Sequence, residues 1–491
     1  MDLNKLESYK ENNRLEAKAA QGGIPKSIWG SVCAFANTSG GLIVLGVKER
    51  KDGTLEIVGL SDAHKMLDDF WNAALSKDKM SARFLNDEDA RIEVINDREI
   101  IVIEVPRVSR FMRPMFLNKD ILGETWQRTH TGDHRCAREE IQSMLRDAES
   151  SSDDALIADN VTMEQVDFET VRRYRMIFSE KNSNHIWNAA TDEDFLQFIG
   201  AARRDKEGQL HPTRAGILMF GQDCWITHEF PNYFLDYRQE TSSQTRWEDR
   251  FTSNTGDWSG NIYDFYIKVY NKLKAALKVP FKLEGIERVD DTPAHEALRE
   301  AIVNCVTNAN YHERRGIVCV WDNEALTLAN PGDFRIPIAE AMKPGESDPR
   351  NVALLKMFSM IDAGERAGSG ISKIMQGWRD AGYASPRYTE RYGPDRTALI
   401  LPLAPVSAEK NRQIKSADTF TVRTGKTAEN MQRILEYLTK NGSSKSADIA
   451  TELGLSVSRT NELLKALVDA GTVEAAGRAR SAQYRLAVGD R

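Results

Sequence analysis

A polar and glycine-rich turn, residues 37–41 (Asn-Thr-Ser-Gly-Gly), leads into a continuous apolar run from Leu42 to Val47. A short apolar run that follows a glycine turn is typical of a central strand buried on both faces. A second such run, Ile100 to Val105, is interrupted only by Glu104. The sequence from about Pro25 to Asn37 predicts a helix that precedes this turn. The turn and its strand therefore predict an α/β unit near the N-terminus.

The chain has 491 residues, which is too long for one core and suggests about three domains of roughly 100 to 200 residues each. We therefore expect an α/β (α+β) multi-domain protein. Residues 216–220 and 233–237 read as strands of a connecting lobe, and residues 293–308 as a long helix. The expected segments are an α/β domain at 1–148, a linker lobe at 160–285, a second α/β layer at 286–405, a tether at 406–426 and a winged helix at 427–488.

Charge and composition limit the classes of partner. The net charge is −7, so nucleic acid would have to bind at local patches, although residues 407–491 carry 14 Lys and Arg against 10 Asp and Glu. No run approaches the roughly 18 apolar residues of a spanning helix, and the five cysteines form no Cys-x-x-Cys pair. We expect a cytoplasmic protein with buried thiols and no membrane partner.

The last sixty residues have helix-turn-helix spacing. Amphipathic helices are predicted at 428–439, 445–453 and 457–470, with Ser456 as the N-cap of the third. A hairpin of residues 472–474 and 482–486 would form the wing. A recognition helix presents polar residues to base edges, and the wing presents cations to phosphate. The predicted DNA contacts are Ser458, Arg459, Asn461 and Lys465 on the helix and Arg478 and Arg480 on the wing. The alternative is a winged helix used for dimerisation or contact with another protein.

The N-terminal motif resembles a known family. The motif has three parts: residues 36–41 (Ala-Asn-Thr-Ser-Gly-Gly) before a strand that ends Gly-Val, residues 16–18 (Glu-Ala-Lys) upstream, and residues 126–128 (Trp-Gln-Arg) with Gly132 downstream. Together they resemble the AlbA-like "divergent ATPase" domain of Schlafen proteins. The resemblance covers about the first 148 residues. It departs from the family in Ala17, which replaces an aromatic residue, in Lys48-Glu49, where an Asp is usual, and in the absence of the zinc ligands of the animal proteins.

Three carboxylates define a candidate metal site in this domain. Residues 14, 16 and 18 share one face of a strand because side chains alternate with period two. Glu49 follows the central strand and would converge with Glu16, and Glu11 would add a third carboxylate. Such a set could hold Mg²⁺ or Mn²⁺ for phosphodiester cleavage. The resemblance to ribonuclease Schlafens implies catalytic roles for Glu11, Glu16 and Glu49 with Lys18. The alternative is a set of solvated surface charges.

A series of arginines accompanies these carboxylates. Arginine guanidinium groups bind phosphate oxygens, and so a clustered set predicts RNA or DNA binding by this domain. The alternative is again a set of solvated side chains. The arginines predicted to contact nucleic acid are Arg14, Arg107, Arg110, Arg113, Arg128 and Arg135.

A second resemblance covers residues 160–405. Glu300 and Asn304 lie four apart on one helix face and could hold magnesium on a nucleotide. With residues 330–333 (Asn-Pro-Gly-Asp) and 364–371, they resemble the C-terminal domain of a bacterial family often labelled RecG-like, which has the histidine-kinase/gyrase (GHKL) ATPase fold. The resemblance implies ATP binding by Glu300, Asn304, Asn330, Gly332, Gly368 and Gly370. A fold that binds no nucleotide is the alternative, since the glycine signatures are short and no Gly-Lys-Ser/Thr loop is present.

These features favour a bacterial Schlafen-like protein that binds nucleic acid and regulates transcription. The alternative function is a metal-dependent endoribonuclease that cuts structured RNA such as tRNA, in stress or phage defence. A third hypothesis is a protein whose contacts with a partner are controlled by a bound nucleotide, but no distinctive motif in the sequence indicates it. Animal Schlafens pair two copies of the N-terminal domain, so the resemblance also implies a homodimer or larger oligomer.

Overall fold

The computed structural model describes two compact units, residues 1–411 and 412–491. The described residues are 6, 9, 11–76, 78–129, 132–240, 247–275, 277, 283–284, 287–288, 292–322, 324–343, 345–364, 368–392, 395–405, 430, 433–435, 437–439, 441–453, 456–469, 473–476 and 483–486. The expected tether at 406–426 lies outside them. No helix of the described part is long and apolar enough to cross a membrane.

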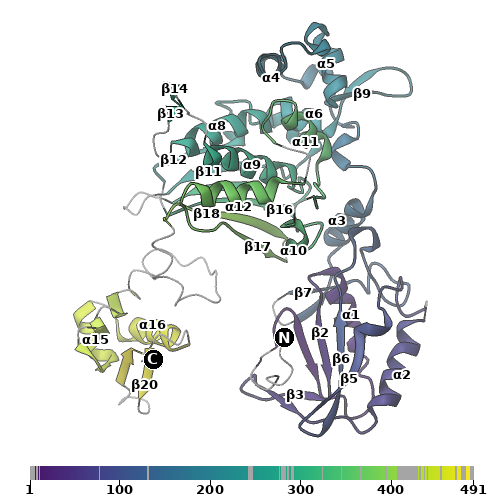
Figure 1. Cartoon of the computed structure of the whole chain (residues 1–491), viewed down its shortest axis with the longest axis vertical. Coiled ribbons are helices and arrows are strands. Elements are labelled where there is room, and N and C mark those ends of the chain that lie inside the picture. Colours follow the sequence, from purple (N-terminus) through teal and green to yellow (C-terminus); the bar gives the residue numbers. More distant parts are fainter. Residues whose placement is uncertain are drawn as a thin grey trace. The chain divides into compact units, whose positions relative to one another are not determined.

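The first sheet has four strands in the order β1-β2-β6-β5 (Figure 1). Only β1 and β2 pair in parallel. The strands are β1 (Leu15–Lys18), β2 (Gly41–Leu45), β5 (Ala90–Ile95) and β6 (Arg98–Val105). Ile43 and Leu45 of β2 pack into one core cluster, whereas Val44 packs into another on the opposite face. This arrangement confirms a strand buried on both faces and explains its continuous apolar sequence.

Helices and hairpins complete this part of the chain. The helix predicted at residues 25–37 is confirmed as α1, which packs in the same core cluster as Ile43. The elements are α1 (Ile28–Asn37), α2 (Ala63–Ala74), α3 (Arg138–Ala148), the hairpin of β3 (Val47–Glu49) and β4 (Leu55–Ile57), and the hairpin of β7 (Trp126–Thr129) and β8 (Gly132–Arg135). Strand β1 also contacts β3.

A helical lobe follows. Its elements are α4 (Phe168–Lys181), α5 (Asp192–Ile199), the hairpin of β9 (Ala202–Arg204) and β10 (Leu210–Pro212), α6 (Arg214–Phe220) and α7 (Asp223–Glu229). The strand expected at residues 216–220 is wrong, because these residues form helix α6. Thr213 caps this helix by accepting the backbone N–H of Gly216, and every residue from Ala215 to Phe220 is buried. A short, wholly apolar run has the same sequence pattern in a buried helix as in a buried strand.

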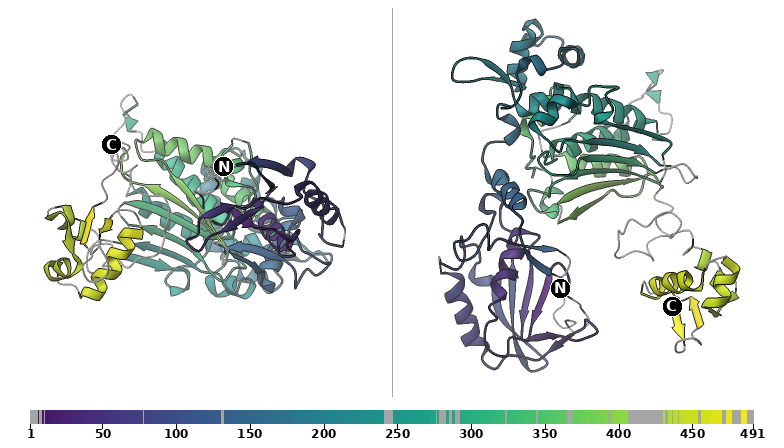
Figure 2. Two further views of the ribbon diagram at one scale, coloured as in Figure 1. Left: turned by 90° about the horizontal axis from the view of Figure 1, so that it is seen from below. Right: turned by 180° about the vertical axis from the view of Figure 1, so that it is seen from behind.

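The second sheet has six strands in the order β12-β11-β15-β16-β18-β17. Helices α9 and α12 pack together over the sheet, with α8 beside α9, and Figure 2 shows this layering from two further directions. The strands are β11 (Leu235–Gln239), β12 (Asp249–Thr252), β15 (Ile317–Trp321), β16 (Ala325–Pro331), β17 (Arg387–Arg391) and β18 (Arg396–Pro402), and the helices are α8 (Ile262–Lys274), α9 (Pro293–Thr307), α10 (Ile338–Ala341), α11 (Val352–Ser359) and α12 (Gly370–Asp380).

The second sheet includes strands from both sides of the domain boundary expected between residues 285 and 286. Strand β11 pairs in parallel with β15, so the strand expected at 233–237 belongs to the second sheet. One core cluster runs from Ala158 to Leu401 and includes residues of both expected segments. The lobe and the second α/β layer therefore share a core.

The unit of residues 412–491 contains a three-stranded sheet in the order β19-β21-β20. Its described elements are β19 (Ser444–Lys445), α15 (Ser446–Leu453), α16 (Val457–Asp469), β20 (Val473–Ala476) and β21 (Gln483–Leu486). Strands β20 and β21 pair antiparallel, as expected for a wing. The first expected helix, at 428–439, is described only in part, and its Ile434 and Leu438 pack with Leu463 and Leu467 of α16.

Candidate functional sites

The N-terminal motif builds the interior of the first domain. The Asn37 side-chain amide donates to the carbonyls of Met115 at 2.8 Å and Trp126 at 2.9 Å, and its oxygen accepts the Met115 N–H at 2.7 Å. The neighbouring Thr38 hydroxyl accepts the Arg128 N–H at 3.1 Å. Asn37 and Thr38 are buried, so both act by fixing the strand that carries Arg128.

Arg128 links the two parts of the motif. Its guanidinium forms ion pairs with Glu16 and Asp133, each at 2.8 Å, and lies 4.8 Å from the centre of the Phe35 ring. Ser31 donates to the second oxygen of Asp133 at 2.6 Å. Only 1% of the Arg128 side chain is exposed. The predicted phosphate contact at Arg128 is thus occupied by carboxylates of the protein itself.

Glu16 is held by two cations. Lys18 donates to its other oxygen at 2.6 Å, as the shared strand face predicted. A metal ion at Glu16 would have to displace Lys18 or Arg128 from a carboxylate oxygen. Glu16 therefore belongs to a series of ion pairs that connects Lys18, Glu16, Arg128 and Asp133.

Glu16 and Glu49 lie close enough to Glu11 to interact with it electrostatically. Burial raises the pKa of Glu11, and the negative charges of Glu16 and Glu49 raise it further, against the hydrogen bond that Glu11 accepts from the Ala17 N–H at 2.8 Å. Glu49 itself is exposed on β3. Within the described ranges, no group of three His, Cys, Asp or Glu side chains has the arrangement needed to hold a metal ion. The carboxylates are neighbours, but they are not assembled as a metal centre.

Three of the predicted arginines are buried in an ion-pair network. Side-chain exposure is 6% for Arg107, 10% for Arg110 and 4% for Arg113. We call this the arginine network, and its members are Arg107, Arg110, Arg113, Arg335, Arg350, Asp147, Asp333, Asp348 and Glu390. These ion pairs engage guanidinium groups that the sequence predicted to bind nucleic acid. By contrast, Arg14 is exposed, and Arg135 is exposed beside Glu124 at 2.7 Å.

Asp333 is the central carboxylate of the network. It receives Arg107 and Arg113 at 2.8 Å on one oxygen and Arg350 at 3.2 Å on the other. Burial alone would raise the pKa of Asp333, but the charges of Arg113, Arg107 and Arg350 hold it well below its usual range. Sequence analysis missed Asp147, Asp333, Asp348 and Arg350, because no local pattern marks a residue whose partners lie about two hundred positions away.

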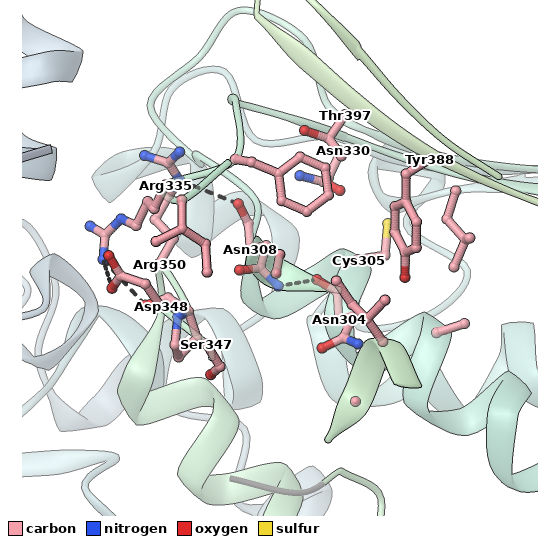
Figure 3. A pocket seen from close by; sticks show the side chains of 18 of the residues that line it. Asn304, Cys305, Asn308, Asn330, Arg335, Ser347, Asp348, Arg350, Tyr388 and Thr397 are labelled. Carbon is pink, nitrogen blue, oxygen red and sulfur yellow. Dashed lines mark hydrogen bonds and ion pairs between the residues drawn. The ribbon is translucent and has the colours of Figure 1, made fainter. Parts of the chain in front are cut away.

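The expected nucleotide residues gather around one pocket above α9, shown in Figure 3. Its lining includes Glu300, Asn304, Asn330, Gly368 and Gly370. Arg335, Arg350 and Asp348 lie at one end, and Asn304, Cys305 and Tyr388 at the other. The Tyr388 hydroxyl is buried and has no hydrogen-bond partner in the described part of the chain.

The size of this pocket limits what it can hold. Its volume is about 100 Å³, whereas sites for drug-sized molecules span about 300 to 1,000 Å³. A Cβ atom on Gly370 would lie 2.3 Å from a Glu300 oxygen and 3.0 Å from the Asn304 amide nitrogen, so the start of α12 lies directly against this pair. Gly332 is not in the lining, but its φ of +99° and its approach to Arg350 require glycine. As it stands, the pocket suits a small group better than a whole nucleotide.

The recognition helix presents an exposed stripe. Val457, Asn461 and Lys465 are four residues apart and all exposed, while Leu463, Leu464 and Leu467 are buried against the rest of the unit. The Ser456 hydroxyl accepts the Arg459 N–H at 3.2 Å, which confirms the predicted N-cap, and Arg459 is half-buried. The side chain of Ser458, and Arg478 and Arg480 of the wing, lie outside the described residues.

Comparison with known families identifies the domains. Residues 9–137 match the "Schlafen, AlbA_2" model, residues 320–398 the "Putative ATP-dependent DNA helicase recG C-terminal" model and residues 428–474 the "Winged helix-turn-helix DNA-binding" model. Residues 142–236 match "Domain of unknown function (DUF8451)". The chain therefore carries a Schlafen AlbA-like domain, a RecG-type ATPase-like domain and a winged helix, which confirms the resemblances seen in the sequence. Two of these domains are of kinds that bind nucleic acid.

Solved structures with similar features were also found. The DIP2311 protein of Corynebacterium diphtheriae is 16% identical over 96% of this chain and 94% of its own, with a TM-score of 0.40. The N-terminal domain of a RecG-related protein from Nitrosomonas europaea is 26% identical over 28% of this chain and 90% of its own, with a TM-score of 0.21. The Zalpha domain of Carassius auratus PKZ, solved with Z-DNA, is 26% identical over 12% of this chain and 97% of its own, with a TM-score of 0.12. All three TM-scores are below 0.5. No curated protein matches this chain significantly.

Proposed function

We propose that this protein is a DNA-binding regulator of transcription whose winged helix makes the sequence-reading contacts. The observation that carries the proposal is the exposed stripe of Val457, Asn461 and Lys465 on α16, opposite a packed core. An asparagine can pair with adenine in the major groove, a lysine with guanine or phosphate, and an exposed valine with a thymine methyl group. The match to a winged-helix DNA-binding model adds support.

The first domain has a supporting role in this proposal. Its predicted contacts Arg107, Arg110, Arg113 and Arg128 are engaged by carboxylates of the protein, which leaves Arg14 and Arg135 exposed. Burial of most of the arginines favours the winged helix as the main DNA contact. RNA binding through Arg14 and Arg135 is a further part of the proposal.

Selection from a random duplex library with the full-length chain tests the reading role. We expect an enriched sequence motif that Asn461→Ala weakens at one base position, by about 1 to 3 kcal/mol of discrimination. Arg204→Ala, which removes an exposed cation from the β9–β10 hairpin, is the matched control and should leave the motif unchanged. The proposal would be contradicted if the wild type enriched no motif, or if the Asn461→Ala variant enriched the same motif as the wild type.

A metal-dependent endoribonuclease is the second candidate. One observation favours it: Glu16 and Glu49 lie near Glu11, and their charges add to burial in raising the pKa of Glu11. Mg²⁺ or Mn²⁺ would neutralise these like charges, and Glu16→Gln would then abolish cleavage of structured RNA while preserving affinity. Incubation of wild-type protein and this variant with labelled tRNA and either ion tests it. Absence of cleavage with both ions would remove the candidate.

ATP binding and homo-oligomer formation remain proposals. The polar residues around the pocket, chiefly Glu300 and Asn304, support the first. The second rests on the Schlafen resemblance alone, and light scattering that gives a 55.3 kDa monomer at micromolar concentration would overturn it.

A further inference from the structure

The arginine network contains more positive than negative groups. Its ion pairs join five arginines to four carboxylates. Asp147 is shared by Arg335 and Arg350, and Asp348 by Arg110 and Arg335. Asp333 is shared by three arginines. The carboxylates present therefore cannot pair every guanidinium group one to one.

The unmatched donors belong to Arg113 and Arg107. Arg113 donates to Asp333 through Nη1 alone, while its Nε and Nη2 are buried and have no hydrogen-bond partner in the described part of the chain. The Nε of Arg107 is likewise buried and unpartnered. Arginine commonly binds carboxylate or phosphate with two parallel N–H groups, and the buried donors of Arg113 are of this kind.

Arg113 is a charged group in this setting. Burial lowers the pKa of a guanidinium, but the charge of Asp333, its hydrogen bond and the charge of Asp147 together raise the pKa of Arg113 above its ordinary value. A buried cation with unused donors is costly unless a partner satisfies them. The two carboxylates whose charges act on it are already engaged, Asp333 by three arginines and Asp147 by Arg335 and Arg350.

A solvent-open groove reaches the network at Arg107. This groove of about 450 Å³ is lined by Arg107 and by Arg83, Asn86 and Ser109. Arg83 adds a further cation at the groove. The groove therefore borders Arg107, which pairs with the same Asp333 oxygen as Arg113.

We propose that Arg113 and Arg107 form a binding site for a phosphate group at the contact between the first domain and the ATPase-like domain. Two N–H groups of Arg113 would donate to two phosphate oxygens, and the Nε of Arg107 to a third. The group belongs either to free phosphate or to a nucleotide. The site depends on neither DNA reading by α16 nor cleavage at Glu16.

Isothermal titration calorimetry of the full-length chain with inorganic phosphate tests the site. We expect one phosphate per chain and at least a tenfold loss of affinity in Arg113→Lys, because lysine keeps the charge but lacks two parallel donors. Arg91→Lys, at an exposed arginine of the same domain that pairs with Glu93, is the matched control and should bind as the wild type does. Circular dichroism establishes that each variant is folded.

ATP as a competitor distinguishes the two sources. Displacement of phosphate by ATP assigns the site to nucleotide phosphates, and failure to displace it assigns the site to the free ion. If Arg113→Lys does not fold, Arg107→Lys replaces it and should also weaken binding. Absence of phosphate and ATP binding in the wild type, or unchanged affinity in the folded lysine variants, overturns the proposal.

Discussion

The arginine network and the recognition helix use basic side chains in opposite ways. In the network, Arg107, Arg113 and Arg350 are at most 8% exposed and surround one carboxylate. On α16, Lys465 is exposed and lies in one stripe with Asn461. A buried ion pair is strongly coupled to stability, whereas an exposed cation affects mainly association with charged partners. The difference predicts which substitutions damage the fold and which damage binding.

Arg350→Ala should have the largest effect. It leaves Asp147 and Asp333 short of a partner in a buried site, and removal of one member of a buried pair costs about 3 to 5 kcal/mol. Urea unfolding monitored by tryptophan fluorescence measures the change. Arg135→Ala, which breaks an exposed pair, should shift stability by no more than about 0.5 kcal/mol. Equal effects of the two variants would remove the distinction between buried and exposed arginines.

The pH dependence of stability gives the next largest effect. Burial raises the pKa of Asp154 from 3.8 to about 6. Between these two values the folded protein binds more protons than the unfolded chain, so the free energy of unfolding falls as pH rises from about 4 to about 6. The expected loss from this residue is up to about 3 kcal/mol. Asp154→Asn should abolish it, which a comparison of urea midpoints at pH 4.5 and pH 7 would reveal. Identical pH profiles would contradict the assignment.

The smallest expected effect is on the salt dependence of DNA affinity, to which the two regions should contribute differently. Each phosphate contact contributes about 0.9 to the slope of log affinity against log salt concentration for duplex DNA. Lys465→Ala should reduce this slope by about 1, whereas Arg107→Lys should leave it unchanged because Arg107 is engaged within the protein. Fluorescence anisotropy of the full-length chain at several salt concentrations measures both. A reduced slope in the Arg107 variant would mean that the arginine network opens to bind DNA.

Local patterns were sufficient to predict the elements around the functional regions. The glycine turn before Leu42 predicted β2, helical spacing predicted α1 and α9, and Ser456 predicted the start of α16. These features depend on neighbours within a few residues, where periodicity and capping are informative.

Contacts between distant segments could not be predicted in this way. Arg107 and Asp333 are 226 residues apart, and so the arginines near position 110 looked like a basic surface. Strand β11 pairs with β15 across about eighty residues, which hid the extent of the second sheet. The helix at residues 214–220 was missed because its apolar run is short enough for a strand. Glu16 and Glu49 were correctly placed near Glu11, and Lys18 beside Glu16, but Arg128 was not foreseen as a partner of Glu16.

The hydrogen bonds of Asn37 affect how genetic data on this domain should be read. Its amide joins α1 to Met115 and Trp126, so almost any substitution leaves buried backbone groups unpaired. A mutational scan for activity would rank Asn37 with true ligand contacts, although it contacts only the protein interior. Loss of function at the Ala-Asn-Thr motif is therefore evidence about folding, and assays of protein abundance must accompany any scan before residues of this motif are described as catalytic.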